Sequence, residues 1–172
     1  MPGTALQPYD VAVALRLLDG PDASYPALAR DLGLSQSTAH AAVRRLDVAG
    51  LVRTGADGTR RAVNRRALLE FLEHGVKYAF PAVLGPATRG VPTAHAGPVL
   101  ADAVAGDAPV VWPDAAGTVE GAALEPLLRR AGALPARRPR TYALLTAVDA
   151  LRVGRARERR LASAYLREQL AG

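Results

Sequence analysis

The sequence predicts a mainly α-helical fold with one small β-hairpin, and three observations lead to that prediction. Apolar residues recur at helical spacing near both ends of the chain. Capping residues precede these stretches, and glycines follow them. Residues 74–135 instead hold 16 of the 29 glycines and prolines, which break helices and central strands. We therefore predict helical residues 7–75, an irregular α+β region with short strands over 76–138, and C-terminal helices over 139–172.

Length and composition limit the classes of protein that fit. The chain has 172 residues, of which 49% are hydrophobic, and this is enough to bury a core. It contains no run of 18 apolar residues and no basic flank before an apolar N-terminal stretch, so we expect neither a membrane span nor a signal peptide. The absence of cysteine removes disulfides and thiolate chemistry. These features predict a cytoplasmic protein.

The chain is basic, and almost all of its positive charge comes from arginine. Lys and Arg number 22 against 16 Asp and Glu, which gives a net charge of +6, and Lys77 is the one lysine. Arg donates paired hydrogen bonds to phosphates and to guanine edges. A GC-rich genome would produce the same excess of arginine, so the charge favours a nucleic-acid partner without proving one.

Three helices and a short turn are predicted near the N-terminus. The apolar spacing of Tyr9–Leu18 indicates the first helix. Ser24 can cap a second helix that ends at Gly33, and Ser35 can cap a third over residues 36–49, stopped by Gly50. Gly33 accepts a positive φ, which permits a tight turn between these two helices. This arrangement is a helix-turn-helix layout.

The third helix has an apolar face and a polar face. From Ala39 its apolar residues recur at i, i+4 and i+7. At about 100° per residue, polar side chains gather on the opposite face and at the exposed N-terminal end: Gln36, Ser37, His40 and Arg44. Donors and acceptors of these types can read base edges in a major groove. The alternative is a solvated face on a structural helix.

A two-stranded hairpin is predicted directly after the third helix. Residues 51–54 and 59–63 have strand composition and flank a turn with Asp-Gly chemistry. A hairpin in this position is a wing, and its arginines suit phosphates or an adjacent minor groove: Arg53, Arg60 and Arg61. Asn64 can cap a fourth helix that ends at Gly75.

Residues 7–73 resemble the winged helix-turn-helix domain of bacterial MarR-, ArsR- and IclR-like regulators. The stretch YPALARDLGLSQSTAH at 25–40, VRRL at 43–46 and AGLV at 49–52 carry the resemblance. It implies a dimeric transcriptional regulator whose third helix reads the major groove. By position it implies base contacts from Gln36, Ser37, His40 and Arg44. It likewise implies phosphate contacts from Ser35, Thr38, Arg45 and the wing arginines.

The middle segment gives weaker signals. Residues 75–84 are apolar enough for a core strand that leaves the fourth helix. Residues 86–98 lack periodicity and are expected to wrap around the surface. Residues 110–112 and 118–119 flank a turn that suits a hairpin or two short strands. Trp112 is expected in the core or in a dimer contact, and its indole N–H needs a partner if it is buried.

Two amphipathic helices are predicted from Pro139 onward, separated near Gly154. Their apolar stripes favour a dimer interface, and the docking of an acidic protein partner is an alternative. Five cations lie between the stripes. They are predicted either to contact phosphate or a partner, or to form a solvated face: Arg152, Arg155, Arg157, Arg159 and Arg160.

The predicted function is sequence-specific binding of double-stranded DNA by a dimeric transcriptional repressor at the bacterial nucleoid. The alternative is an antitoxin or adaptor that holds a partner protein with its C-terminal helices. We expect no enzymatic activity, because the chain has no glycine-rich phosphate loop, no Gly-x-Ser-x-Gly elbow and no metal-ligand spacing. Accordingly, we expect no cofactor and no metal.

Overall fold

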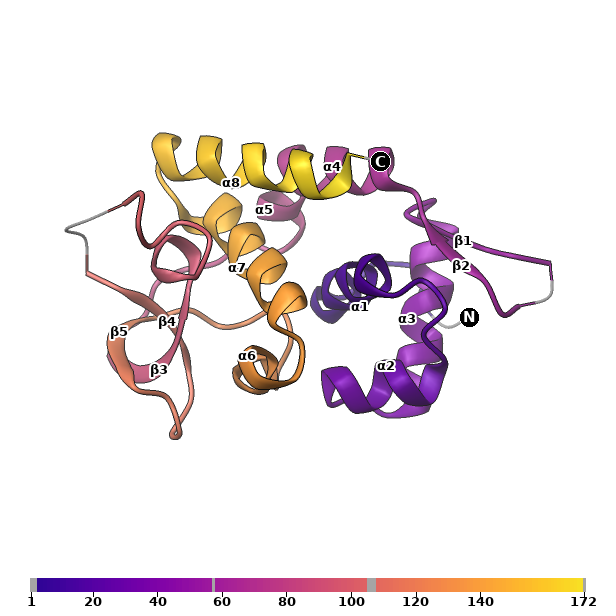
Figure 1. Ribbon diagram of the computed structural model, residues 1–172, viewed down its shortest axis with the longest axis horizontal. Coiled ribbons are helices and arrows are strands. Elements are labelled where there is room, and N and C mark those ends of the chain that lie inside the picture. Colours follow the sequence, from indigo (N-terminus) through magenta and orange to yellow (C-terminus); the bar gives the residue numbers. More distant parts are fainter. Residues whose placement is uncertain (1–2, 57, 105–107, 172) are drawn as a thin grey trace.

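The computed structural model describes residues 3–56, 58–104 and 108–171 and confirms a mainly α-helical fold with a small hairpin (Figure 1). The N-terminal half contains α1 (Pro8–Asp19), α2 (Tyr25–Leu32), α3 (Gln36–Val48), β1 (Val52–Thr54), β2 (Arg61–Val63) and α4 (Arg65–His74). The rest of the chain contains α5 (Val76–Ala79), β3 (Ala87–Thr93), η1 (Ala94–Ala96), β4 (Val110–Pro113), β5 (Val119–Ala123), η2 (Ala131–Ala133), α6 (Leu134–Arg137), α7 (Pro139–Val153) and α8 (Ala156–Leu170).

Local side-chain signals begin and end the N-terminal helices. The side chains of Ser24, Ser35 and Asn64 each accept a hydrogen bond from the backbone N–H three residues ahead, which satisfies a donor at the start of α2, α3 and α4. Gly33 adopts a φ of 67° between α2 and α3, and Gly50 adopts a φ of 73° after α3. The predicted caps and the glycine turn are therefore confirmed.

The middle segment differs from the prediction in two places and agrees with it in a third. Residues 75–84 are not a strand, because the backbone continues helically through Gly75 into α5, which ends at Ala79, and residues 80–84 have no regular secondary structure. Residues 86–98 are not a surface loop, since they contain β3, which pairs with both β4 and β5. Of the two structures predicted for residues 110–119, the second is confirmed: β4 and β5 are two short strands, and they run parallel and do not form a hairpin.

The three strands β3, β4 and β5 form a small closed sheet in which each strand pairs with the other two. The N-terminal half of β3 pairs with β5, and its C-terminal half pairs with β4. Gly90 lies where β3 changes its partner strand, and it pairs with both β4 and β5. A Cβ at this position would collide with the carbonyl oxygen of Trp112, so the close approach requires glycine.

Helix α7 lies in the middle of the structure and joins its two halves. It packs against α1 of the N-terminal half and against α5, α6, α8, η1 and β3. One continuous hydrophobic core therefore spans all three predicted segments. Trp112 is buried in it, and its indole N–H donates to Asp149 Oδ2 at 2.6 Å.

The apolar stripes of α7 and α8 are largely buried in the core of the chain itself. The side chains that are fully or almost fully buried are Leu144, Leu145, Val148, Leu151, Ala162, Leu166 and Leu170. An interface between two copies would need other residues, because these are already covered. None of the helices in the described part of the chain is long and apolar enough to cross a membrane.

Candidate nucleic-acid interface

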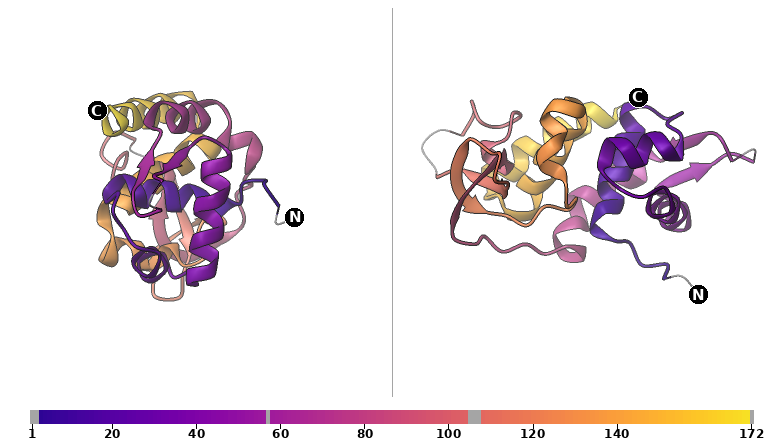
Figure 2. Two further views of the ribbon diagram at one scale, coloured as in Figure 1. Left: turned by 90° about the vertical axis from the view of Figure 1, so that its right-hand side faces the viewer. Right: turned by 90° about the horizontal axis from the view of Figure 1, so that it is seen from below.

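The interface is built on α3, whose buried and exposed faces have different chemistry. Ala39, Ala42, Val43 and Leu46 are at most 1% exposed and fix the helix against the core. The left view of Figure 2 shows the outer side of α3 running along the front of the molecule beside the β1–β2 hairpin. The polar side chains predicted to read bases are all exposed: Gln36, Ser37, His40 and Arg44.

Ser35 and Thr38 organise the N-terminal turn of α3. Ser35 Oγ accepts the backbone N–H of Thr38 at 3.0 Å and lies 2.7 Å from Thr38 Oγ1 and 2.9 Å from Ser37 Oγ. The three hydroxyls therefore form one exposed cluster at the positive end of the helix dipole, which suits an anion such as a phosphate. The assignment of Ser35 and Thr38 to the DNA backbone remains a prediction.

His40 is in contact with a ring of α2. Its centroid lies 4.9 Å from that of Tyr25, with 55° between the ring planes. The Tyr25 ring is also in contact with the guanidinium of Arg61, whose Cζ lies 4.0 Å from the ring centroid. The Tyr25 ring thus links the hairpin to α3 and limits the rotation of His40.

Arg45 must be corrected from a phosphate contact to a structural residue. Its Nε and Nη2 donate to the two carboxylate oxygens of Asp10, both at 2.7 Å, and Nη2 also lies 3.1 Å from Tyr9 Oη. The side chains of Arg45 and Asp10 are 13% and 1% exposed. The hydrogen bond with Asp10 raises the pKa of the Arg45 guanidinium despite its partial burial. Its charge is already used to attach α3 to α1.

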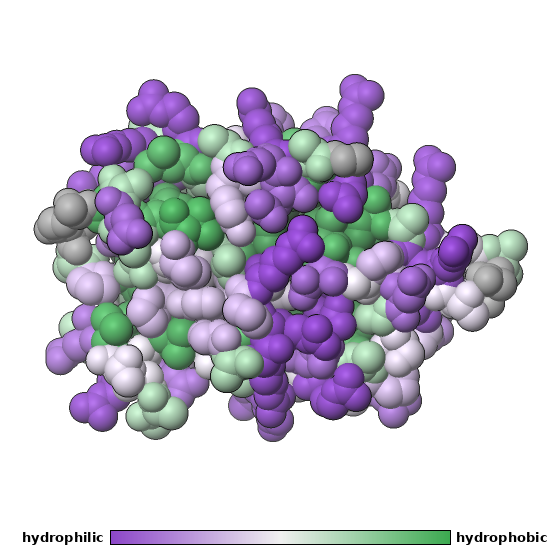
Figure 3. All heavy atoms as spheres, viewed as in Figure 1, coloured by the Kyte–Doolittle hydropathy of each residue, from purple (hydrophilic) through white to green (hydrophobic). Residues whose placement is uncertain are grey.

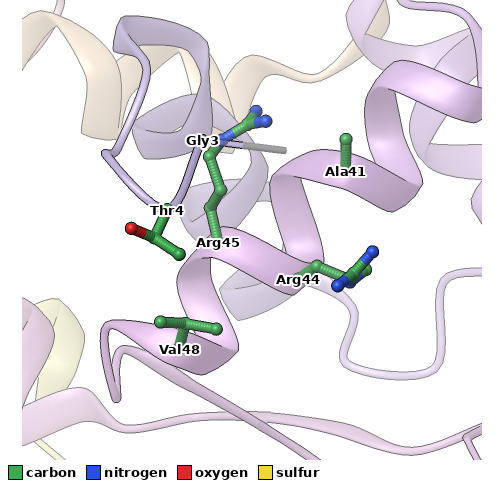
Figure 4. Close-up of a pocket in the computed structure, with 6 residues that line it drawn as sticks. All are labelled: Gly3, Thr4, Ala41, Arg44, Arg45 and Val48. Atoms are coloured by element: carbon green, nitrogen blue, oxygen red, sulfur yellow. The ribbon is translucent and has the colours of Figure 1, made fainter. Parts of the chain in front are cut away.

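The side chain of Arg44 points in a different direction from that of Arg45. In Figure 4 the side chains of Arg44 and Arg45 leave α3 in different directions, and Arg44 is exposed. The two arginines and Val48 line a pocket of about 60 Å³ beside Gly3 and Thr4 of the N-terminal arm. This volume is far below the roughly 300–1,000 Å³ of typical ligand sites. The arm therefore borders the reading face without forming a ligand cavity.

The wing supplies two exposed arginines, and the third needs a correction. Arg53 of β1 and Arg60, which precedes β2, are exposed. Arg61 is 5% exposed, covers the Tyr25 ring and donates from Nη1 to the carbonyl oxygen of Ala23 at 2.9 Å. Arg61 therefore fastens the hairpin to the start of α2, and its side chain is largely covered.

The arginines of the C-terminal helices are not equivalent. Arg152 must be corrected, because its side chain is 5% exposed, pairs with Asp149 at 2.7 Å and donates from Nε to Phe80 O at 3.0 Å. Arg157 and Arg159 are exposed but donate to the carbonyl oxygens of Ala103 and Gly154. The other two predicted cations, Arg155 and Arg160, are also exposed, so these four remain candidates for an anionic partner.

A further group of basic residues was missed by the sequence reasoning. Residues 129–140 contain five arginines and no acidic residue, and four of the five are exposed. The density of arginine in this stretch was the available signal. The contact of this stretch with α2 could not be predicted from the sequence, because about 100 residues separate the two segments. Among the described residues, no group of three or more His, Asp or Glu side chains is arranged to hold a metal ion.

One of three comparisons with known proteins found a match, and it agrees with this geometry. No curated protein and no solved structure matches the chain. The resemblance to MarR-, ArsR- or IclR-like regulators in particular stays a prediction. Residues 15–53, which run from α1 through α2 and α3 into β1, match the family model described as winged helix-turn-helix DNA-binding, so the chain carries a winged helix-turn-helix DNA-binding domain.

Proposed function

We propose that the protein is a sequence-specific, double-stranded DNA-binding transcriptional regulator in which α3 enters the major groove. The observation that carries the proposal is the division of α3 into a core face and an exposed polar face with Gln36, Ser37, His40 and Arg44. Histidine, amide and hydroxyl groups can exchange hydrogen bonds with base edges, and Arg pairs with guanine O6 and N7. The winged helix-turn-helix match supports the same conclusion.

The wing has a separate role in this proposal. Arg53 and Arg60 would neutralise phosphates beside the groove that α3 occupies, because both are exposed. The hydroxyls of Ser35 and Thr38 would hold a phosphate at the start of α3. These contacts set the position of α3 on the duplex, and the side chains on its outer face set the sequence preference.

The regulator would act as a dimeric repressor located at the bacterial nucleoid. A two-fold dimer presents two copies of α3, so its operator would contain two half-sites about one helical turn, or roughly 34–36 Å, apart. Bound across a promoter, such a dimer would exclude RNA polymerase. The chemistry of this role requires no catalytic group or cofactor.

A gel-shift experiment with the DNA upstream of the protein's own gene tests the proposal. The salt concentration is titrated, and excess random-sequence duplex is added as competitor. A complex that survives the competitor is expected, followed by a footprint with two related half-sites. If the competitor removes all binding both to this fragment and to duplexes selected from a random pool, then the protein is not sequence-specific.

A further inference from the structure

The surface between α2 and α6 carries a dense group of arginines that the winged helix-turn-helix role does not use. We define it as the α2–α6 arginine patch, and it consists of Arg30, Arg130, Arg137, Arg138 and Arg140. Figure 3 shows strongly hydrophilic side chains gathered in the middle of this face, where α6 and α2 lie opposite each other in Figure 1.

Contacts between distant parts of the chain assemble the patch. Arg138 Nη2 lies 2.7 Å from Asp31 Oδ2 of α2, and Arg137 Nη1 donates to the carbonyl oxygen of Arg30 at 3.3 Å. The Arg130 side chain covers the glycine turn, since a Cβ on Gly33 would lie 2.8 Å from Arg130 Cδ. These contacts hold the cations in fixed positions relative to α2.

The patch has much more positive than negative charge. Asp31 is shared among Arg16, Arg30 and Arg138, and Arg16 lies buried behind the patch. Asp19 lies 3.8 Å from Arg140. The side chains of Arg30 and Arg140 remain 71% and 46% exposed. The carboxylates of Asp31 and Asp19, together with that of Asp114 against Gly132 of η2, therefore balance only part of the charge of the five patch arginines and the buried Arg16 behind them.

The chemistry of the patch favours phosphate over an acidic protein. A stable protein interface needs buried apolar or aromatic anchors in its centre. The large apolar side chains found exposed in the described residues are Val48, Tyr78, Val83 and Leu84, and none of them belongs to α2, η2, α6 or the start of α7. The guanidinium fork binds phosphate oxygens in pairs without any such anchor.

The position of the patch separates it from the reading face. In the left view of Figure 2, α3 and α2 occupy different sides of the helix-turn-helix, and α6 packs against α2. Arg130 lies over the turn just before α3, but α6 with Arg137 lies on the side of α2 that is away from α3 (Figure 1), so a duplex on the outer face of α3 leaves that part of the patch open. We propose that the α2–α6 arginine patch binds the phosphate backbone of a second DNA segment, independently of sequence. The protein would then bridge two duplexes or two parts of one.

Substitutions at the surface of the molecule test this second binding site. The patch variant is Arg130→Gln with Arg137→Gln, and the control, Lys77→Gln with Arg89→Gln, removes two cations elsewhere. Each pair is placed in the whole chain and in a background of His40→Ala with Arg44→Ala, which disables the reading face. Thermal unfolding checks that every variant folds. Binding of a random-sequence duplex is then followed by fluorescence anisotropy at several salt concentrations.

The disabled background should still bind duplex through the patch and through the wing arginines, and the patch substitutions separate the two contributions. Adding the patch substitutions should reduce the slope of log K against log salt by about 0.9 for each phosphate that the protein no longer neutralises. The control pair should not change the slope. In the whole chain, the patch variant should keep its first duplex when that duplex is immobilised and fail to capture a second, labelled one.

Two results would overturn the inference without affecting the proposed function. One is a disabled background that binds no duplex even at low salt while the unmodified chain binds specifically. The other is a patch variant that loses affinity for polyglutamate but binds duplex unchanged, which would mean that the patch recognises an acidic protein. Failure of the proposed function has a different signature, namely the absence of any sequence preference in the unmodified chain.

Discussion

Arg45 of α3 and Asp10 of α1 form a two-point ion pair in which Nε and Nη2 each lie 2.7 Å from a different carboxylate oxygen. Asp10 also accepts the backbone N–H of Gln7 at 2.8 Å and thereby caps α1. The orientation of α3 therefore depends on the start of α1, because one carboxylate holds both helices. The adjacent arginine, Arg44, takes no part in this pair and is exposed.

Arg45→Ala should lower the free energy of unfolding by about 3–5 kcal/mol, because it leaves the buried Asp10 carboxylate without its partner. Urea unfolding followed by circular dichroism measures the change. Arg44→Ala is the matched control and should stay within about 0.5 kcal/mol of the unmodified chain. Equal stability of both variants would contradict a structural role for Arg45.

Arg44→Ala should weaken binding to the selected operator by about 1–3 kcal/mol, or roughly 5- to 150-fold, if Arg44 pairs with a guanine. Its affinity for random-sequence duplex should change much less. Competition between the two duplexes in a gel shift separates these effects. An Arg44→Ala protein that keeps its full preference for the operator would remove Arg44 from the set of base contacts.

Neighbouring arginines of the wing should respond differently to substitution. Arg60→Ala should weaken binding to every duplex alike and lower the salt slope by about 0.9, because the exposed arginine would no longer neutralise one phosphate. Anisotropy titrations at several salt concentrations measure this slope.

Arg61→Ala is the contrasting variant of the wing. It should instead destabilise the fold by about 1–2 kcal/mol, because it removes the packing on Tyr25 and the hydrogen bond to Ala23. Urea unfolding measures this change. A stable Arg61→Ala protein with a lowered salt slope would mean that Arg61 does leave Tyr25 to reach DNA.

The elements predicted correctly are those specified by short-range signals. Ser24, Ser35 and Asn64 cap helices through bonds to residues three positions ahead, and Gly33 adopts a conformation that other residues avoid. The strand β3 was missed for the opposite reason. Its partners begin about 20 residues later in the chain, and Gly90 and Pro92 in its interior argue locally against a strand.

The candidate site shows the same division. Helical spacing predicts which side chains of α3 lie away from its apolar face, and Gln36, Ser37, His40 and Arg44 are exposed. It could not distinguish the roles of Arg44 and Arg45, because the partner of Arg45 lies 35 residues earlier. Arg61 and Arg152 each also donate to a carbonyl oxygen distant in the sequence, that of Ala23 or Phe80, although the ion-pair partner of Arg152, Asp149, lies only three residues away.

The pH dependence of stability should report on Asp31, which is 7% exposed beneath three arginines. Burial acts to raise the pKa of Asp31. The hydrogen bond from Arg16 and the charges of Arg138 and Arg16 outweigh burial, so the pKa is lowered overall. A carboxyl group with a lowered pKa stabilises the fold above its unfolded pKa of about 3.9 and loses that contribution as the pH falls through the lower folded value.

Asp31→Asn should therefore cost about 3 kcal/mol near pH 7, where the arginines lose their carboxylate partner. The difference in stability from the unmodified chain should shrink as the pH falls below about 4, because Asp31 then becomes protonated in the unmodified chain as well. Urea unfolding at a series of pH values measures both curves. Glu120→Gln, at an exposed carboxyl group of β5, is the control and should leave the curve unchanged. A difference that stays constant down to pH 2 would show that shape and hydrogen bonding, rather than the charge of Asp31, attach α2 to α1 and α6.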